Sequence, residues 1–118
     1  MTDRMSGAYV RDQLVTALTR LALPAIEQAR YLDRLGTGPS TDELALELGD
    51  FIPMLSVAVG DGALSQSQAL AIKSVSDYVR SFSGPNRADL WEATQLYTAP
   101  EWEDVRKLAS TALRLLTS

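Results

Sequence analysis

The stretch "TAPEWEDVRKLASTALRLL", which runs from Thr98 to Leu116, carries the pattern that decides the fold class. Apolar residues recur in it at intervals of three and four, the spacing that places side chains on one side of an α-helix. Thr98 and Glu101 have the spacing of a capping box, and Pro100 falls in the first turn, where a missing amide costs least. The stretch therefore predicts a helix over residues 99–116 with a buried stripe of Trp102, Val105, Ala109, Leu113 and Leu116.

The acidic residues at the start of this helix have local roles. Glu101, Glu103 and Asp104 lie at the positive end of the helix dipole, and Glu103 has the favourable i, i+4 spacing to Lys107. We therefore interpret these acids as helix-stabilising residues rather than as a carboxylate site.

The same periodicity extends over the rest of the chain. Apolar stripes predict helices near residues 8–35, 41–59 and 66–82 and a short helix near 87–95, separated by the turns "GTGPS", "GDG" and "SGPN". No stretch alternates apolar and polar residues as a strand would. The sequence thus predicts an all-α protein, a single compact bundle of four main helices plus one short connecting helix, in one domain over residues 1–118.

Caps and prolines punctuate these predicted helices. Two further stretches have capping-box form, "STDE" with Ser40 and Glu43 and "SQSQ" with Ser65 and Gln68. Pro24 and Pro53 fall inside predicted helices, where proline removes a backbone donor and clashes with the preceding turn. The apolar stripe keeps its phase across Pro24, which favours a kink there, and Pro53 should bend the second helix.

The composition excludes much of enzyme chemistry. The chain has no cysteine and no histidine, so it lacks the usual general base, thiolate ligands and the commonest transition-metal ligand. No Gly-x-Ser-x-Gly elbow, Ser-x-x-Lys frame or phosphate-binding loop is present. We expect a protein that is not an enzyme, with no cofactor and no metal; an enzyme with a carboxylate-bound metal is a distant alternative.

Charge and hydropathy constrain the location and the partners. The N-terminal residues contain charges and no long apolar run, which argues against a signal peptide or a membrane span and predicts a cytoplasmic protein. A net charge of -4 and a pI near 4.7 argue against binding to nucleic acid. An acidic protein is better suited to a basic protein partner.

The acidity is concentrated in one part of the chain. Between Arg34 and Lys73 there are five acidic residues and no Lys or Arg, a local charge of -5 in a chain whose total is -4. A carboxylate row beside apolar side chains is the composition of an electrostatically steered protein contact. The alternative is a solvated helix surface. The predicted protein-binding residues are Asp42, Glu43, Leu46, Glu47, Asp50, Met54 and Val57.

The C-terminal segment from Ala88 to Leu116 resembles that of small acidic all-helical bacterial proteins, some of them read as immunity proteins of polymorphic toxin systems. The resemblance is carried by Leu90-Trp91 and by Pro100-Glu101-Trp102-Glu103, followed by Val105-Arg106, Leu108-Ala109 and Ala112-Leu113. It implies a non-catalytic inhibitor that binds and neutralises a basic cognate toxin. The competing hypothesis is a dimerisation or regulatory scaffold module, in which the apolar residues of the acidic row would meet their copies in a homodimer.

Overall fold

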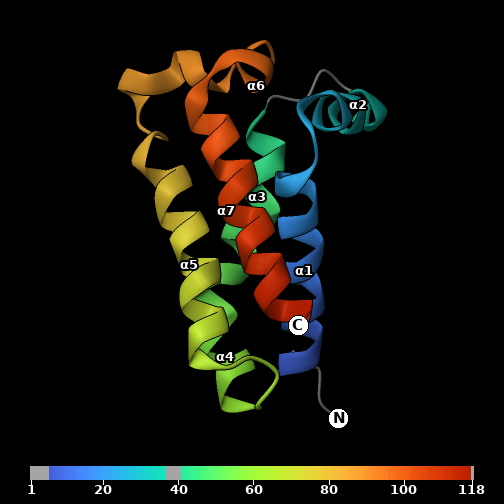
Figure 1. Ribbon diagram of the computed structural model, residues 1–118, viewed down its shortest axis with the longest axis vertical. Coiled ribbons are helices and arrows are strands. Elements are labelled where there is room, and N and C mark those ends of the chain that lie inside the picture. The colour runs from blue at the N-terminus through green and yellow to red at the C-terminus, as the bar shows by residue number, and fades with distance from the viewer. Residues whose placement is uncertain (1–5, 37–40, 118) are drawn as a thin grey trace.

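The amphipathic segments of the chain are helical throughout the computed structural model, which describes residues 6–36 and 41–117 (Figure 1). Seven α-helices, two 3₁₀ segments and no strand occur in this part of the chain, so the all-α prediction is confirmed. They form a compact globule with a radius of gyration of 14.5 Å. The elements are α1 (Gly7–Ala22), α2 (Ala25–Leu35), α3 (Asp42–Phe51), η1 (Ile52–Met54), α4 (Leu55–Gly60), α5 (Gln66–Ser81), η2 (Pro85–Trp91), α6 (Gln95–Thr98) and α7 (Pro100–Thr117).

The kink expected at Pro24 is a complete break. Leu23 and Pro24 are both extended, with ψ of 151° and 153°, so α1 and α2 are separate helices. The ring of Pro24 disfavours the helical conformation at Leu23, and this ends α1. The fully buried side chain of Gln28 compensates, since its Nε2 donates to the carbonyls of Arg20 at 3.1 Å and of Leu21 at 3.0 Å.

The other predicted helices are divided as well, so the count of four main helices with one short helix does not describe the structure. The bend predicted at Pro53 takes the form of η1, a 3₁₀ turn between α3 and α4. The short helix predicted near residues 87–95 is the 3₁₀ segment η2, followed after a turn by α6. The first division places Pro53 at the start of η1, where it has no helical amide to supply.

The three predicted capping boxes differ in outcome. At Ser65 both bonds are present, because its hydroxyl accepts from the Gln68 amide at 3.1 Å and Gln68 Oε1 accepts from the Ser65 amide at 2.8 Å. The prediction for Thr98 is wrong: Thr98 ends α6, and extended Ala99 precedes α7. Ser40 lies outside the described residues, and α3 begins at Asp42.

Helix α1 lies at the centre of the packing, with its inward stripe completely buried. It packs extensively against α7 and α3, and α5 packs extensively against α7, whereas α3 and α5 touch only slightly. Trp102 of α7 is buried as predicted, and so are Ile72, Val75 and Val79 of α5, whereas Leu35 at the end of α2 is exposed. The α1–α7, α1–α3 and α5–α7 interfaces are therefore closely packed, whereas the α3–α5 interface is open.

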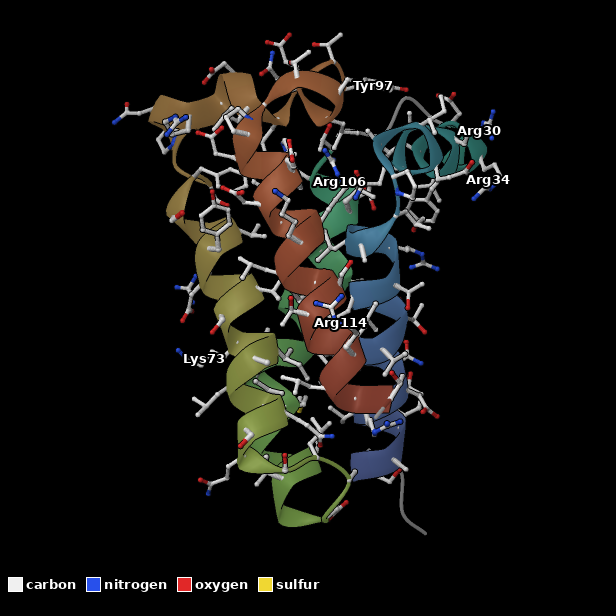
Figure 2. All side chains as sticks on the ribbon, in the orientation of Figure 1. Arg30, Arg34, Lys73, Tyr97, Arg106 and Arg114 are labelled. Atoms are coloured by element: carbon white, nitrogen blue, oxygen red, sulfur yellow. The ribbon has the colours of Figure 1, made fainter. Side chains whose placement is uncertain are left out.

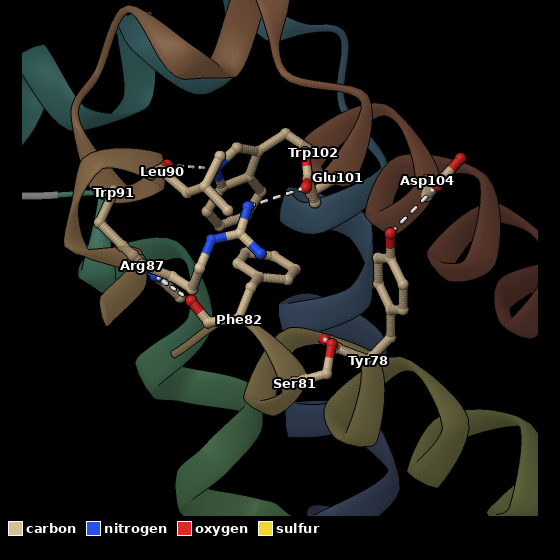
Figure 3. A network of polar contacts seen from close by, with 9 residues as sticks. All are labelled: Tyr78, Ser81, Phe82, Arg87, Leu90, Trp91, Glu101, Trp102 and Asp104. Carbon is tan, nitrogen blue, oxygen red and sulfur yellow. Dashed lines mark hydrogen bonds and ion pairs between the residues drawn. The ribbon is translucent and has the colours of Figure 1, made fainter. Parts of the chain in front are cut away.

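An aromatic cluster closes the end of the fold where α5, η2 and α7 meet (Figure 3). The ring of Trp102 lies edge-on to Trp91 at 5.1 Å and to Phe82 at 5.4 Å between centroids. Both indoles are also tethered, since Trp102 Nε1 donates to the Leu90 carbonyl at 2.7 Å and Trp91 Nε1 donates to the Phe82 carbonyl at 2.9 Å. The prediction that Trp102 lies in the core is confirmed.

Truncation of Trp102 should be among the most damaging single substitutions in this chain. Trp102→Ala removes a fully buried indole and leaves the Leu90 carbonyl without its donor, so we expect a loss of about 3–5 kcal/mol in the free energy of unfolding. Urea denaturation measures this loss. Leu70→Ala, on an exposed residue of α5, is the control and should cost under about 0.5 kcal/mol; a similarly small loss for Trp102→Ala would contradict its core position.

Acid should weaken the start of α7 through Glu101. A backbone hydrogen bond to this carboxylate, and then its bond from Arg87 Nη2 at 3.1 Å, lower the pKa of Glu101 from its ordinary value. A carboxyl whose pKa is lowered by folding favours the folded state above its unfolded pKa, and this contribution disappears as the pH falls through the folded pKa. The stability difference between wild type and Glu101→Gln should therefore shrink between about pH 6 and pH 3.

Chemical denaturation at several pH values measures this difference. Glu92→Gln, which changes an exposed carboxylate without a side-chain ion pair among the described residues, should show a smaller dependence on pH. Equal pH profiles for the two variants would contradict the role of Glu101.

Candidate functional site

Positive charge is absent from α3, η1 and α4 and present on the helices around them. Figure 2 labels Arg30 and Arg34 on α2, Lys73 on α5, and Arg106 and Arg114 on α7. Helix α3 lies behind α7 in this view and carries none. The acidic segment therefore has no positive charge of its own, and the cations nearest to it come from neighbouring helices, Arg20 of α1 and Arg80 of α5.

Asp61 and Glu47, two acids of that segment, bind groups on α1. Asp61 Oδ2 accepts from the Gly7 amide at 2.6 Å, which places a carboxylate at the positive end of α1. Glu47 forms an ion pair with Arg20 of α1, and the Arg20 guanidinium also lies 4.6 Å from the ring centre of Tyr31. Glu47 therefore joins α3 to α1 and is less available to a partner than the sequence predicted.

The remaining predicted binding residues point in different directions. Asp42, Leu46 and Asp50 line an open groove, and Leu46 is 51% exposed. Glu43 is exposed but lies outside that groove. Met54 is half-buried against the core rather than projecting outward, and Val57 is half-buried. The structure thus brings three of the seven predicted residues together and separates the others from them.

The groove lies along the slightly touching seam between α3 and α5, and we call it the α3–α5 groove. Its volume is about 590 Å³, within the range of roughly 300–1,000 Å³ typical of ligand sites. One wall is α3, with Asp42, Ala45, Leu46, Leu48, Gly49 and Asp50. The other wall is the C-terminal half of α5 and η2, with Ser76, Val79, Arg80, Ser83, Gly84, Pro85, Ala88 and Trp91.

The wall opposite α3 carries two donors without internal partners. Arg80 is exposed, and its guanidinium makes no hydrogen bond or ion pair with the residues that the structure describes. Ser76 is 6% exposed, and its hydroxyl likewise has no partner in residues 6–36 and 41–117. Both groups are therefore free to bind a molecule in the groove.

Gly49 has no side chain, so it leaves space on the α3 side of the groove. It lies inside a helix, where glycine is unfavourable, yet its φ is not positive and a Cβ placed there would meet nothing within 4 Å. The fold therefore does not require glycine at this position. A side chain there would fill part of the groove.

Sequence reasoning missed Arg80, Ser76, Gly49 and Trp91 as members of the site. Arg80, Ser76 and Gly49 carry no local signal in the sequence. They belong to the site only because α3 and α5 face each other.

The described part of the chain contains neither a candidate metal site nor a membrane-spanning helix. No group of three or more acidic side chains there is arranged to hold a metal ion. None of the described helices is both long and apolar enough to cross a membrane.

A second polar cluster, around Arg106, is structural. Arg106 Nη1 donates to Gln28 Oε1 at 3.1 Å and to the Leu96 carbonyl at 3.0 Å, which ties α7 to α2 and α6. Burial lowers the pKa of this guanidinium from its ordinary value, and the charge of Glu103 opposes that change. Because its donors serve the fold, we do not assign Arg106 to the candidate site.

Comparisons of the chain with protein-family models, curated proteins and solved structures gave no significant match. The α3–α5 groove and its charges are therefore the features of the described residues from which a function is proposed.

Replacing Gly49 by alanine should stabilise the protein. The substitution removes the entropic cost of glycine inside α3 and creates no clash, so we expect a gain of about 0.5–1 kcal/mol in the free energy of unfolding. Urea denaturation measures it. Gly7→Ala is the opposite control, because its Cβ would lie 2.6 Å from Asp61 Cβ, and it should destabilise the protein. A loss of stability for Gly49→Ala would show that the fold requires this glycine.

Proposed function

We propose that this protein is a non-catalytic binding domain that engages a basic protein partner through the acidic side of α3. The observation that carries the proposal is the pair of carboxylates Asp42 and Asp50, which flank exposed Leu46 on a groove-lining helix without a single cation. Carboxylates of this kind raise the encounter rate, and apolar groups beside them hold the complex. The resemblance in the C-terminal segment makes a cognate toxin the partner that we propose, neutralised by binding.

The dimerisation hypothesis receives less support from this geometry. It needed Leu46, Met54 and Val57 as a joint apolar contact, whereas Met54 packs against the core. Two copies related by a two-fold axis would also bring the same carboxylates together.

Charge reversal at Asp50 tests the proposal. The test protein is a basic partner recovered by affinity purification or encoded by the neighbouring gene. Asp50→Lys should slow its association about threefold or more at low ionic strength and by less at physiological salt, because steering acts over a Debye length of roughly 8–10 Å. Surface plasmon resonance at several salt concentrations measures the association rate.

Asp33→Lys is the matched control. Asp33 is exposed, has no side-chain partner among the described residues and lies near the C-terminal end of α2, as Asp50 does in α3. It should leave the association rate unchanged. Glu47 is unsuitable for this test because its reversal would break the ion pair with Arg20. Equal rates for Asp50→Lys and Asp33→Lys would contradict a binding role for the acidic side of α3.

A further inference from the structure

The walls of the α3–α5 groove specify what kind of segment fits between them. We infer that the groove receives an extended segment of a partner in which one apolar residue lies between two basic residues, each two positions away. This inference rests on the proposed function, because it names the part of the basic partner that meets α3.

The spacing along α3 provides the first argument. Asp42, Leu46 and Asp50 follow one another at intervals of four residues and all line the groove. With a rise of 1.5 Å per residue, they are separated by about 6 Å along the helix. Alternate residues of an extended chain, which share one side, are separated by about 6.6–6.8 Å. An extended segment with a basic, an apolar and a basic residue at every second position therefore matches the order carboxylate, leucine, carboxylate along α3.

The two carboxylates can receive these cations. Asp50 is exposed and has no ion pair with any described residue. Asp42 has an interaction of its own within the chain, but a carboxylate accepts up to about four hydrogen bonds. Because they lie about 12 Å apart along α3, one small cation cannot meet both.

The opposite wall favours an extended segment over a helix. A helix satisfies its own backbone carbonyls, whereas an extended segment leaves them open and needs donors. The Arg80 guanidinium and the Ser76 hydroxyl are such donors, both facing the groove and neither bonded to a described residue. They would bond the carbonyls on the side of the segment that faces α5.

The base of the groove and its η2 end are apolar and can accept the apolar residue of the partner segment. Val79 and Leu48 are buried core residues at the groove surface, and the half-buried ring of Trp91 lines its η2 end. The missing side chain at Gly49 leaves room between Leu46 and Asp50. An apolar anchor in such a pocket typically dominates the affinity of an interface.

Selection of a random peptide library displayed on phage against the immobilised wild-type protein tests the inference. Enriched peptides should carry an apolar residue with Lys or Arg two positions before and two positions after it. Enrichment of peptides without this pattern, or no enrichment at all, would overturn the inference.

Filling the groove provides the second test. Gly49→Leu should lower the affinity of the selected peptides about tenfold or more without loss of folding, because its side chain enters the groove and its Cβ meets no atom. Gly60→Leu is the matched control: its Cβ also meets nothing within 4 Å, and Gly60 lies outside the groove. It should bind the peptides as the wild type does. Circular dichroism and thermal denaturation verify that both variants are folded.

The two proposals fail in different ways. If Gly49→Leu and Gly60→Leu bind the peptides equally, the groove is not the peptide-binding site and the inference fails. The proposed function can still hold in that case, because it is tested separately by the effect of Asp50→Lys on the basic partner. If the peptides depend on the groove while Asp50→Lys leaves association with the basic partner unchanged, the proposed function fails. Loss of peptide binding in Arg80→Ala would further support the extended conformation, and unchanged binding would count against it.

Discussion

The buried side-chain amide of Gln28 bridges the gap that Pro24 opens in the backbone. Its two N–H···O bonds replace helix bonds that α1 loses at its C-terminal end, and its carbonyl oxygen accepts from Arg106. Without the second of these bonds the Leu21 carbonyl would be buried without a partner, which costs about 1–3 kcal/mol. The break can therefore be buried, and α2 can turn away across the end of α1 (Figure 1).

This turn determines how the later helices reach their positions. Arg106 extends the Gln28 contact to the Leu96 carbonyl, so α2, α6 and α7 are held together at one end of the molecule. Arg20, just before the break, binds Glu47 and so attaches α3 to α1. Helix α3 thus packs on α1, and its contact with α5 is slight. The open seam that forms the α3–α5 groove is a consequence of this arrangement.

The acids differ in their structural roles. Asp61 stabilises the start of α1 and Glu47 binds Arg20, whereas Asp50 stays in solvent at the groove. Glu103 forms the ion pair with Lys107 that the sequence predicted, whereas Glu101 pairs with Arg87, a contact that the sequence did not predict. A carboxylate without a local structural task, beside an exposed Leu46, is the combination that a basic partner would recognise.

The sequence by itself determined the helical class, the approximate helix ranges, most of the buried stripes and the acidic segment, because these depend on spacing along one helix. It could not distinguish a kink from a break at Pro24, since the outcome depends on Gln28 reaching two carbonyls that lie seven and eight residues earlier. It also could not pair Glu47 with Arg20, 27 residues away. Only the tertiary structure decided that Arg80 and Ser76 line the same groove as Asp50, because helical periodicity shows which side of a helix is polar but not which helix lies opposite it.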